Sequence, residues 1–205
     1  MVLVLSGGTV VRSLDPPMVA PADVVVEGGR ILGLGGAAPA GAHAIDCSGC
    51  LVIPGNVCAH HHLYSALARG MPYRLEPPDG FVQILQRVWW RLDRALDPGD
   101  VELSALAGGA DALLSGTTTI VDHHASPNAI EGSLQRLAGP LVELGVRAVL
   151  CYEVTDRDGP ERAAAGIEEN RRFLKEPLPL VRGMVGAHAS FTLSEGTLAG
   201  CVEAA

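Results

Sequence analysis

The sequence predicts an α/β protein, in which a small all-β unit precedes the first half of a (β/α)8 barrel. Residues 1–55 hold short β-type runs separated by glycine and proline, a pattern typical of strands and turns. After Pro54 and Gly55, β-branched runs alternate with runs of helical periodicity. This alternation indicates parallel βα units joined by right-handed crossovers. Residues 56–205 hold four such units, whereas a closed barrel needs about 250 residues.

Short strands account for the first unit. We expect them at residues 2–5, 9–11, 23–27, 30–32, 44–46 and 51–53. Gly28 and Gly29 separate the third of these runs from the fourth. Two glycines between β-type runs predict a hairpin with a two-residue turn. Helical periodicity is absent from this part of the sequence, so the unit is predicted to be all β.

The barrel part is expected to open with a strand at residues 56–60 and a helix over residues 81–92. The helix is predicted by apolar residues that recur at helical spacing, namely Phe81, Ile84, Leu85, Val88, Trp89 and Leu92. Asp97 followed by Pro98 is typical of an N-cap with proline in the first turn, and it opens a second helix that ends at Gly116. The β-branched run at residues 117–121 predicts the second strand.

The same alternation continues to the last residue. A helix is expected over residues 130–144, followed by a strand, a helix and a strand at residues 146–151, 160–174 and 180–187. Ser194 is expected to cap a helix that is still running at Ala205. A half barrel leaves parallel strand edges and half of its core open to water. We therefore interpret the sequence as the N-terminal portion of a longer protein.

His60 and His62 are set two apart at the end of the first barrel strand. Successive side chains on a strand point to opposite faces, so these two histidines share one face while His61 looks away. Two neutral imidazoles aimed at one point form half of a site for a first-row metal, most often zinc or iron. The alternative on spacing alone is a solvated histidine run, or rings that bond to the backbone.

Composition excludes several classes of partner. The chain has 15 basic residues without a Lys/Arg cluster and a formal net charge of −8, so it is a poor candidate for binding nucleic acid. It lacks an apolar run long enough for a membrane span and a basic start typical of a signal peptide. The odd number of cysteines predicts buried free thiols and a cytoplasmic protein. Cys47 and Cys50 have the spacing of a redox or zinc knuckle. This interpretation is less favoured than free thiols, because the sequence lacks a second such pair.

Three segments resemble the amidohydrolase superfamily and occur in family order: residues 52–63, 115–122 and 186–194. They are similar to its aminohydrolase branch of deaminases and chlorohydrolases, which act on nucleobases, triazines and related rings. The aminohydrolases called SsnA carry similar stretches at residues 68–72, 88–93 and 122–128. The resemblance covers essentially the whole chain. It implies a metal-dependent hydrolase of the (β/α)8 TIM barrel fold, preceded at residues 1–55 by part of a composite β-sandwich domain.

The resemblance implies roles at matching positions. His60 and His62 match metal ligands, and His188 matches a histidine that contacts the substrate. The alternative for His188 is packing beside the helix start at Ser194. His123 and His124 follow the second strand at the same catalytic face. Strand phase does not decide which of these two reaches the site, and a structural role is favoured over a ligand role for either.

Lys175 is the chain's single lysine and falls at the end of a predicted helix. Many binuclear amidohydrolases bridge two metals with a carboxylated lysine on the fourth strand, so we expect one divalent ion here. Zinc is the expected metal, with iron as the alternative. A bound zinc lowers the pKa of water to about 7. By resemblance, the hydroxide attacks an electron-poor ring or amidine carbon and displaces ammonia. The family's remaining metal ligands and general base belong to later strands, so we expect them beyond residue 205 and expect the chain alone to be inactive.

Two other functions remain open at this stage. One is an inactive half barrel that serves as a binding or assembly module, and the other is an amide-cleaving metal hydrolase of the same superfamily. For the aminohydrolase we expect a small heterocyclic or amidine substrate and a homo-oligomer at full length. Trp89 and Trp90 are interpreted as packing residues, with Trp90 covering the barrel bottom or an interface. Arg69 is a candidate for an anionic substrate group, with a surface ion pair as the alternative.

Overall fold

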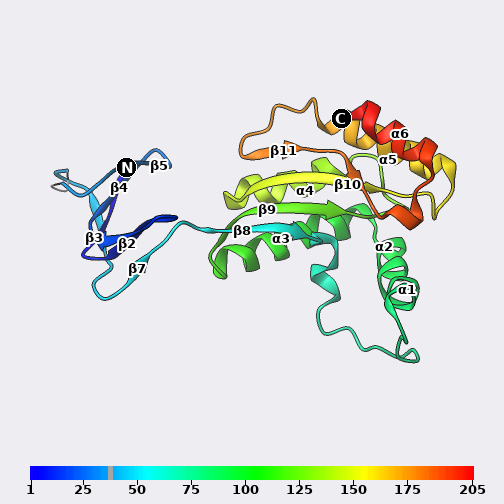
Figure 1. Ribbon diagram of the computed structural model, residues 1–205, viewed down its shortest axis with the longest axis horizontal. Helices are drawn as coiled ribbons and strands as arrows, with labels where there is room; N and C mark the ends of the chain where they lie inside the picture. Colours follow the sequence, from blue (N-terminus) through cyan, green and yellow to red (C-terminus); the bar gives the residue numbers. More distant parts are fainter. Residues whose placement is uncertain (37–38) are drawn as a thin grey trace. The chain divides into compact units, whose positions relative to one another are not determined.

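The computed structural model describes residues 1–36 and 39–205, and the chain divides into two compact units, Met1–Gly55 and Asn56–Ala205 (Figure 1). Each unit has its own sheets and its own buried side chains. Across the described ranges, helices with the length and hydropathy of a membrane span are absent.

The first unit consists of two small sheets. A four-stranded sheet has the order β5-β4-β1-β6, from Arg30–Leu34, Val24–Glu27, Val2–Ser6 and His43–Asp46. A three-stranded sheet has the order β3-β2-β7, from Pro17–Pro21, Thr9–Leu14 and Leu51–Val52. The predicted hairpin is confirmed, because Gly28 and Gly29 join β4 to β5 with φ of 57° and 76°. Strand β3 was not expected, because proline at both of its ends hides an edge strand from pattern analysis.

Many large apolar side chains of the first unit are exposed. Val4, Val10, Val24 and Val25 are buried, whereas exposed positions lie on five of its strands and beside them: Leu14, Met18, Val19, Ile31, Leu32, Leu34, Ile45, Leu51 and Ile53. Exposed apolar area on this scale is unusual for an isolated small domain. The described part of the first unit therefore buries little of its own apolar surface.

The second unit is built on a parallel sheet of the order β11-β10-β9-β8. Its strands are β8 (Asn56–His61), β9 (Thr117–His124), β10 (Arg147–Val154) and β11 (Val181–Gly183), and β12 (Gly186–Ala187) adds a further parallel pairing to β10. The predicted strands are confirmed in number and order along the chain, except that the fourth is split into β11 and β12. This parallel sheet fits part of a TIM barrel.

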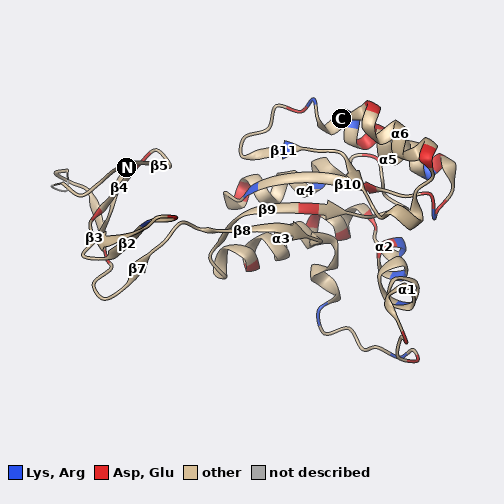
Figure 2. Ribbon diagram, viewed as in Figure 1, with Lys and Arg blue, Asp and Glu red and all other residues tan. Residues whose placement is uncertain are grey.

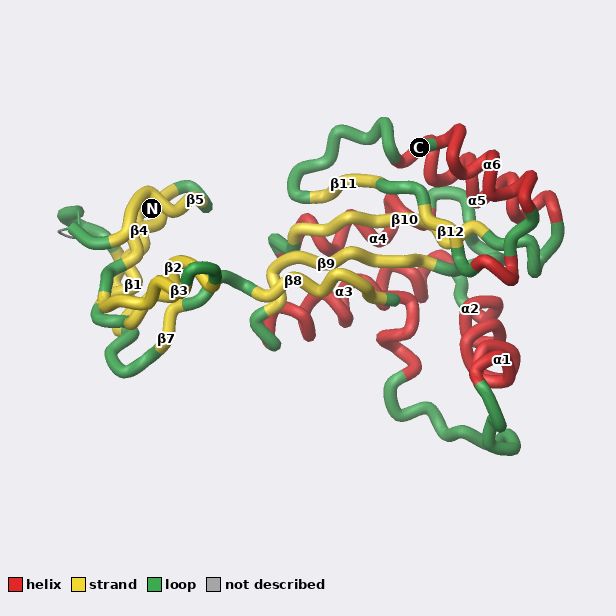
Figure 3. Tube along the Cα trace, viewed as in Figure 1, coloured by secondary structure: helices red, strands yellow, loops and turns green. Residues whose placement is uncertain are grey.

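Helices pack against one face of this sheet (Figure 3). They are α3 (Pro98–Leu114), α4 (Ser133–Leu144) and α5 (Pro160–Phe173), and α6 (Glu195–Ala204) packs on α5. The core between helices and sheet is made of Val101, Ala105, Ile120, Leu134, Leu137, Leu141, Leu150 and Phe173, all at most 2% exposed. The predicted cap of α3 is confirmed, since Asp97 and Asp100 accept hydrogen bonds from each other's backbone N–H.

Other helical segments differ from the predictions. Helix α4 begins at Ser133 rather than residue 130, because Gly132 adopts a φ of 74° and the Glu169 carboxylate accepts hydrogen bonds from Gly132 and Leu134 N–H. The predicted helix at 81–92 is three segments: α1 (Phe81–Ile84), the π-helical η2 (Leu85–Trp89) and α2 (Trp90–Ala95). A short 3-10 helix, η1 (Leu63–Ala68), follows β8 without a sequence signal.

Asn170 of α5 bridges a gap in the edge of β10. Met184 N–H bonds to Leu150 O and His188 N–H bonds to Val154 O, so the backbone of Tyr152 lies between two ladder bonds. The Asn170 carboxamide accepts from Tyr152 N–H at 2.8 Å and donates to Tyr152 O at 2.9 Å. The Asn170 side chain therefore replaces the strand-to-strand hydrogen bonds that are missing where β11 ends and β12 begins.

Replacing Asn170 is expected to destabilise the second unit. Asn170→Ala leaves a buried N–H and a buried C=O of Tyr152 without partners, which costs about 2 kcal/mol or more. Urea unfolding followed by circular dichroism measures the change. Arg171→Ala, on the exposed side of the same helix, is the matched control and should stay within about 0.5 kcal/mol of wild type. Equal midpoints for the two variants would contradict this role of Asn170.

Candidate active site

Side-chain alternation divides the C-terminal ends of β9 and β10 between two faces. An acidic stretch lies within β9 (Figure 2). Asp122 and His124, both of β9, are fully buried on the helix side of the sheet. His123 and Glu153 lie on the opposite face, where they line a cavity of about 340 Å³. Its other lining residues are His60, His62, Tyr64, Phe81, Leu85, Trp89, Trp90, His188, Ala189 and Phe191. The cavity therefore lies at the C-terminal ends of β8, β9, β10 and β12.

The imidazoles of His60 and His62 converge in this cavity. Their Nε2 atoms are 3.1 Å apart. Two nitrogens bound to one tetrahedral zinc at 2.0–2.1 Å lie about 3.3 Å apart. His62 Nδ1 lies 2.8 Å from His123 O, and a carbonyl only accepts, so Nδ1 carries the proton and Nε2 presents its lone pair. This arrangement fits a shared cation.

The described residues supply only part of a metal shell. No group of three or more His, Cys, Asp or Glu side chains within them is arranged to hold a metal. Zinc sites in proteins have three or four protein ligands. A cation on His60 and His62 therefore needs further ligands.

The strand β9 extends past residue 121 and includes both histidines. Of the two, His123 is the one that reaches the cavity. Its Nδ1 lies 3.4 Å from Glu153 Oε2, and its ring lies 6.0 Å from the ring of His60 between centroids. His124 packs on the other face, with Nε2 2.8 Å from Ser126 Oγ. Burial lowers the pKa of His124 to about 4, so it is a neutral structural residue at physiological pH.

His188 also lines the cavity, and its tautomer follows from its neighbours. Thr192 donates its hydroxyl proton to Ala189 O. Thr192 Oγ1 therefore accepts from His188 Nδ1, which lies 2.7 Å away. The other ring nitrogen, Nε2, faces Glu153 Oε1 at 3.7 Å. Burial lowers the pKa of His188 below its usual value, which favours the neutral ring with a free lone pair on Nε2.

Glu153 is a cavity residue that the sequence analysis did not identify. Its side chain is 4% exposed. Burial by itself raises the pKa of this carboxyl, but the hydrogen bond with His123 and the positive charge of Arg157 outweigh it, so the pKa is lowered. The only sequence signal is an acidic residue one position before the end of a buried strand, the same place that His123 occupies in β9.

Trp89 and Trp90 both line this cavity. Trp90, the first residue of α2, lines the cavity at the C-terminal ends of the strands, so the prediction that it covers the barrel bottom is wrong. The cause is the π-helical segment Leu85–Trp89, since a wider turn changes which residues share a helix face. A role of Trp90 at an interface stays a prediction. Trp89 also packs against the core, as predicted.

Arg157 attaches this helical segment to the loop after β10. Its guanidinium lies 5.3 Å from the Trp90 ring, pairs with the Asp93 carboxylate of α2 and lies 3.2 Å from Asp158 Oδ2. Asp93 and Arg157 are almost fully buried, and burial raises the pKa of Asp93 to about 6. A buried pair of this kind fixes the position of the tryptophans over the cavity.

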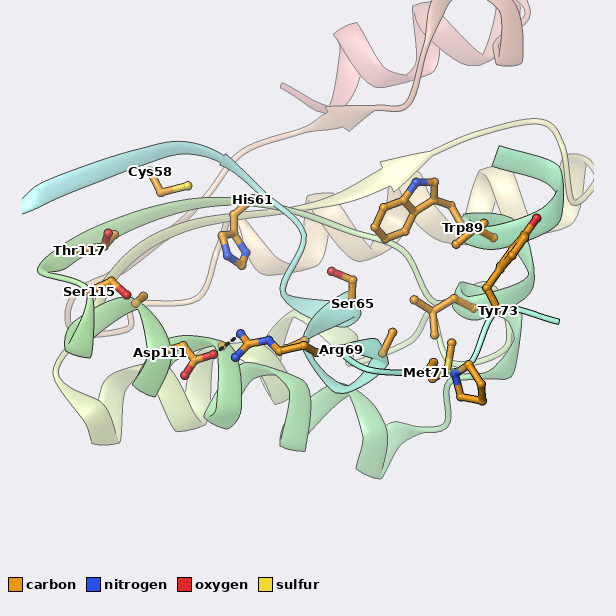
Figure 4. A pocket seen from close by; sticks show the side chains of 17 residues that line it. Cys58, His61, Ser65, Arg69, Met71, Tyr73, Trp89, Asp111, Ser115 and Thr117 are labelled. Carbon is orange, nitrogen blue, oxygen red and sulfur yellow. Dashed lines mark hydrogen bonds and ion pairs between the residues drawn. The ribbon is translucent and has the colours of Figure 1, made fainter. Parts of the chain in front are cut away.

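A second cavity, of about 670 Å³, lies against β8, η1 and α3 (Figure 4). It holds His61, which is close to Asp122 at 3.6 Å, and the ion pair of Arg69 with Asp111. Arg69 thus makes the surface ion pair expected as its alternative role, and it lines this cavity rather than the one that contains His60 and His62. Although it is larger, the second cavity lacks the converging imidazoles.

Comparisons with known proteins place these features in context. The model of the Amidohydrolase family matches residues 51–205. The chain is 30% identical over 217 residues to a 5-methylthioadenosine/S-adenosylhomocysteine deaminase of Symbiobacterium thermophilum, covering 99% of the chain and 46% of that protein. It is 39% identical over 171 residues to an 8-oxoguanine deaminase of Pseudomonas aeruginosa, covering 79% of the chain and 37% of that protein. The chain thus spans less than half the length of these curated relatives.

Solved structures show the same fold. A guanine deaminase from C. acetobutylicum has a TM-score of 0.78 at 16% identity, over 99% of this chain and 50% of that one. The atrazine chlorohydrolase TrzN from Arthrobacter aurescens TC1, complexed with zinc, has a TM-score of 0.74 at 21% identity, over 98% of this chain and 50% of that one. At these identities the likeness concerns the fold alone.

The buried pair of Asp93 and Arg157 is expected to contribute far more stability than the exposed pair of Arg69 and Asp111. Asp93→Ala leaves the buried Arg157 charge with only Asp158, at a cost of about 3 kcal/mol. Asp111→Ala, whose carboxylate is 47% exposed, should cost less than about 1 kcal/mol. Thermal unfolding of the two variants and wild type measures the difference. Similar losses in both variants would show that the Asp93 pair does not anchor the segment.

Proposed function

The chain belongs to the amidohydrolase family, and we propose that it forms the N-terminal part of a metal-dependent aminohydrolase. The reaction is hydrolytic deamination at a C–N bond of a ring or amidine carbon. The observation that carries this proposal is the convergence of His60 and His62 Nε2 at 3.1 Å in a cavity at the strand ends. The deaminase relatives support the same chemistry.

The two units have different parts in this proposal. Residues 56–205 form the first four βα units of the barrel, in agreement with the parallel order β11-β10-β9-β8. Residues 1–55 form part of a composite β-sandwich domain, which accounts for exposed side chains such as Leu14, Ile31 and Leu51. The remaining strands of both domains correspond to the half of the relatives that the chain does not cover.

His60 and His62 are the proposed ligands of one divalent ion, zinc by analogy with the zinc complex of TrzN. When bound, the ion supplies a hydroxide nucleophile near neutral pH by lowering the pKa of water. The hydrogen bond from His62 Nδ1 to His123 O fixes the orientation of that imidazole. Further ligands and the general base come from the second half of the barrel in this proposal.

The rest of the cavity holds the substrate. Phe81, Trp89 and Phe191 supply flat apolar walls that suit a planar ring and exclude water from it. His188 Nε2 accepts a hydrogen bond from the substrate, with the ring held in place through Nδ1 by Thr192. The proposed substrates are small nitrogen heterocycles, such as nucleobases, nucleosides or triazines. We further propose a cytoplasmic homo-oligomer at full length, a location that agrees with the free cysteines.

Metal binding tests the histidine pair directly. Titration of the 205-residue chain with Co²⁺ in a calorimeter should show weak binding at one site, because two imidazoles provide half of a shell. His62→Ala should weaken that binding at least about tenfold, since it removes one of the two ligands. His43→Ala, which removes an exposed histidine of β6, is the matched control and should bind as wild type does. Two metals per site, or equal affinities in all three proteins, would contradict the proposal.

Activity tests the reaction itself. The 205-residue chain is expected to release no ammonia from guanine, 8-oxoguanine or 5′-methylthioadenosine, because the general base is absent from the described residues. The gene's reading frame, expressed beyond codon 205, is expected to release ammonia from one of these rings and to lose at least about a hundredfold of that rate in His62→Ala. Turnover by the 205-residue chain would refute the partial site. Hydrolysis of amides by the longer protein, without ammonia release from rings, would favour the amide-cleaving alternative.

A further inference from the structure

Glu153 is a buried carboxylate that faces the cavity with an unfilled acceptor. Its side chain is 4% exposed. Oε2 has one long contact, to His123 Nδ1 at 3.4 Å. Oε1 lies 3.7 Å from His188 Nε2, which is beyond hydrogen-bond distance. Within residues 1–36 and 39–205, Oε1 receives no hydrogen bond from an N–H or O–H group at normal distance.

The group that faces Oε1 is itself an acceptor. Because His188 Nδ1 donates to Thr192 Oγ1, the neutral ring presents a lone pair on Nε2 toward Glu153. An ionised carboxylate accepts hydrogen bonds and cannot donate them. Two acceptors that face each other across 3.7 Å are complementary to a group with N–H donors that contacts both.

The walls around this pair determine what kind of donor fits. Phe81, Leu85, Trp89 and Phe191 line the same cavity, and the Phe191 ring lies 6.3 Å from the ring of His188. Apolar walls raise the cost of leaving a carboxylate unpaired, so a donor placed there gains a charge-assisted hydrogen bond. A flat ring that carries N–H groups on one edge satisfies both the walls and the acceptors.

We propose that Glu153, together with His188, determines substrate specificity by accepting hydrogen bonds from the N–H edge of a planar heterocycle, as in an oxopurine with a lactam N–H. This inference rests on the proposed function. It favours a 9-substituted guanine over a 9-substituted adenine, because the ring nitrogens N1, N3 and N7 of the adenine are all acceptors. Adenine's only amino group is the one that the reaction removes, so it leaves no donor for Glu153.

Ligand binding to the 205-residue chain tests the inference. Trp89 and Trp90 are the chain's two tryptophans and both line the cavity, so their fluorescence reports occupancy. The probes are 9-methylguanine and 9-methyladenine, which are similar in size and differ in their N–H edge. Wild type is expected to bind 9-methylguanine at least about tenfold more tightly, the effect of one charge-assisted hydrogen bond.

Variants separate recognition from a structural role. Glu153→Gln keeps the shape of the side chain but loses its charge, so it should lose the preference for 9-methylguanine. Glu153→Asp keeps the charge and should retain the preference at lower affinity. Glu168→Gln removes a charge from the exposed side of α5 and should behave as wild type. A merely structural Glu153 would change the affinity for both probes equally and leave their ratio as it is.

Cobalt binding distinguishes the failure of this inference from the failure of the proposed function. Glu153→Gln should bind Co²⁺ as wild type does, because Glu153 does not contact His60 or His62. Equal or undetectable binding of the two probes by wild type, with Co²⁺ binding intact, would overturn the inference alone. Loss of Co²⁺ binding from wild type itself would overturn the metal site and the proposed function with it.

Discussion

The register of the parallel strands is the constraint on which the site depends. Strand β9 pairs with β8 and β10, and β12 pairs with β10 so that Gly186 lies opposite Glu153. A Cβ atom at Gly186 would lie 2.7 Å from both Tyr152 O and Cys151 Sγ, a distance that Cβ atoms do not adopt. Glycine therefore lets β12 approach β10 closely enough to place His188 beside Glu153.

The same alternation leaves polar groups on the helix side, and they fix the exit of the chain from β8. Asp122 is fully buried and accepts a hydrogen bond from Leu63 N–H at 2.6 Å. That bond holds the start of η1 directly after His62. Gly108 of α3 makes room for this turn, since a Cβ there would lie 2.7 Å from a Leu63 methyl. The direction of the His60 and His62 side chains is thus set by packing on the face that they do not occupy.

Local signals predicted most of the framework, whereas the shape of the cavity depends on tertiary structure. Asp97 and Pro98, the Ser194 cap and the alternation after Gly55 are short-range features, and the structure contains each of them. The π-helical turn leaves no mark in the sequence, yet its wider turn changes which of the following residues share a helix face, so sequence could not place Trp90. Nor could the sequence identify Glu153 as a cavity residue, because a single acidic residue in a strand does not form a repeating pattern. Choosing between His123 and His124 requires knowing which face of β9 each side chain occupies, and only the pairing of the strands shows this.

The charges in the cavity connect the proposed metal ligands, His60 and His62, with the carboxylate of Glu153. Glu153 remains ionised although it is buried, because the hydrogen bond with His123 and the positive charge of Arg157 lower its pKa. A cation on His60 and His62 would add positive charge close to His123, whose ring lies 6.1 Å from that of His62. It would therefore favour the ionised form of Glu153.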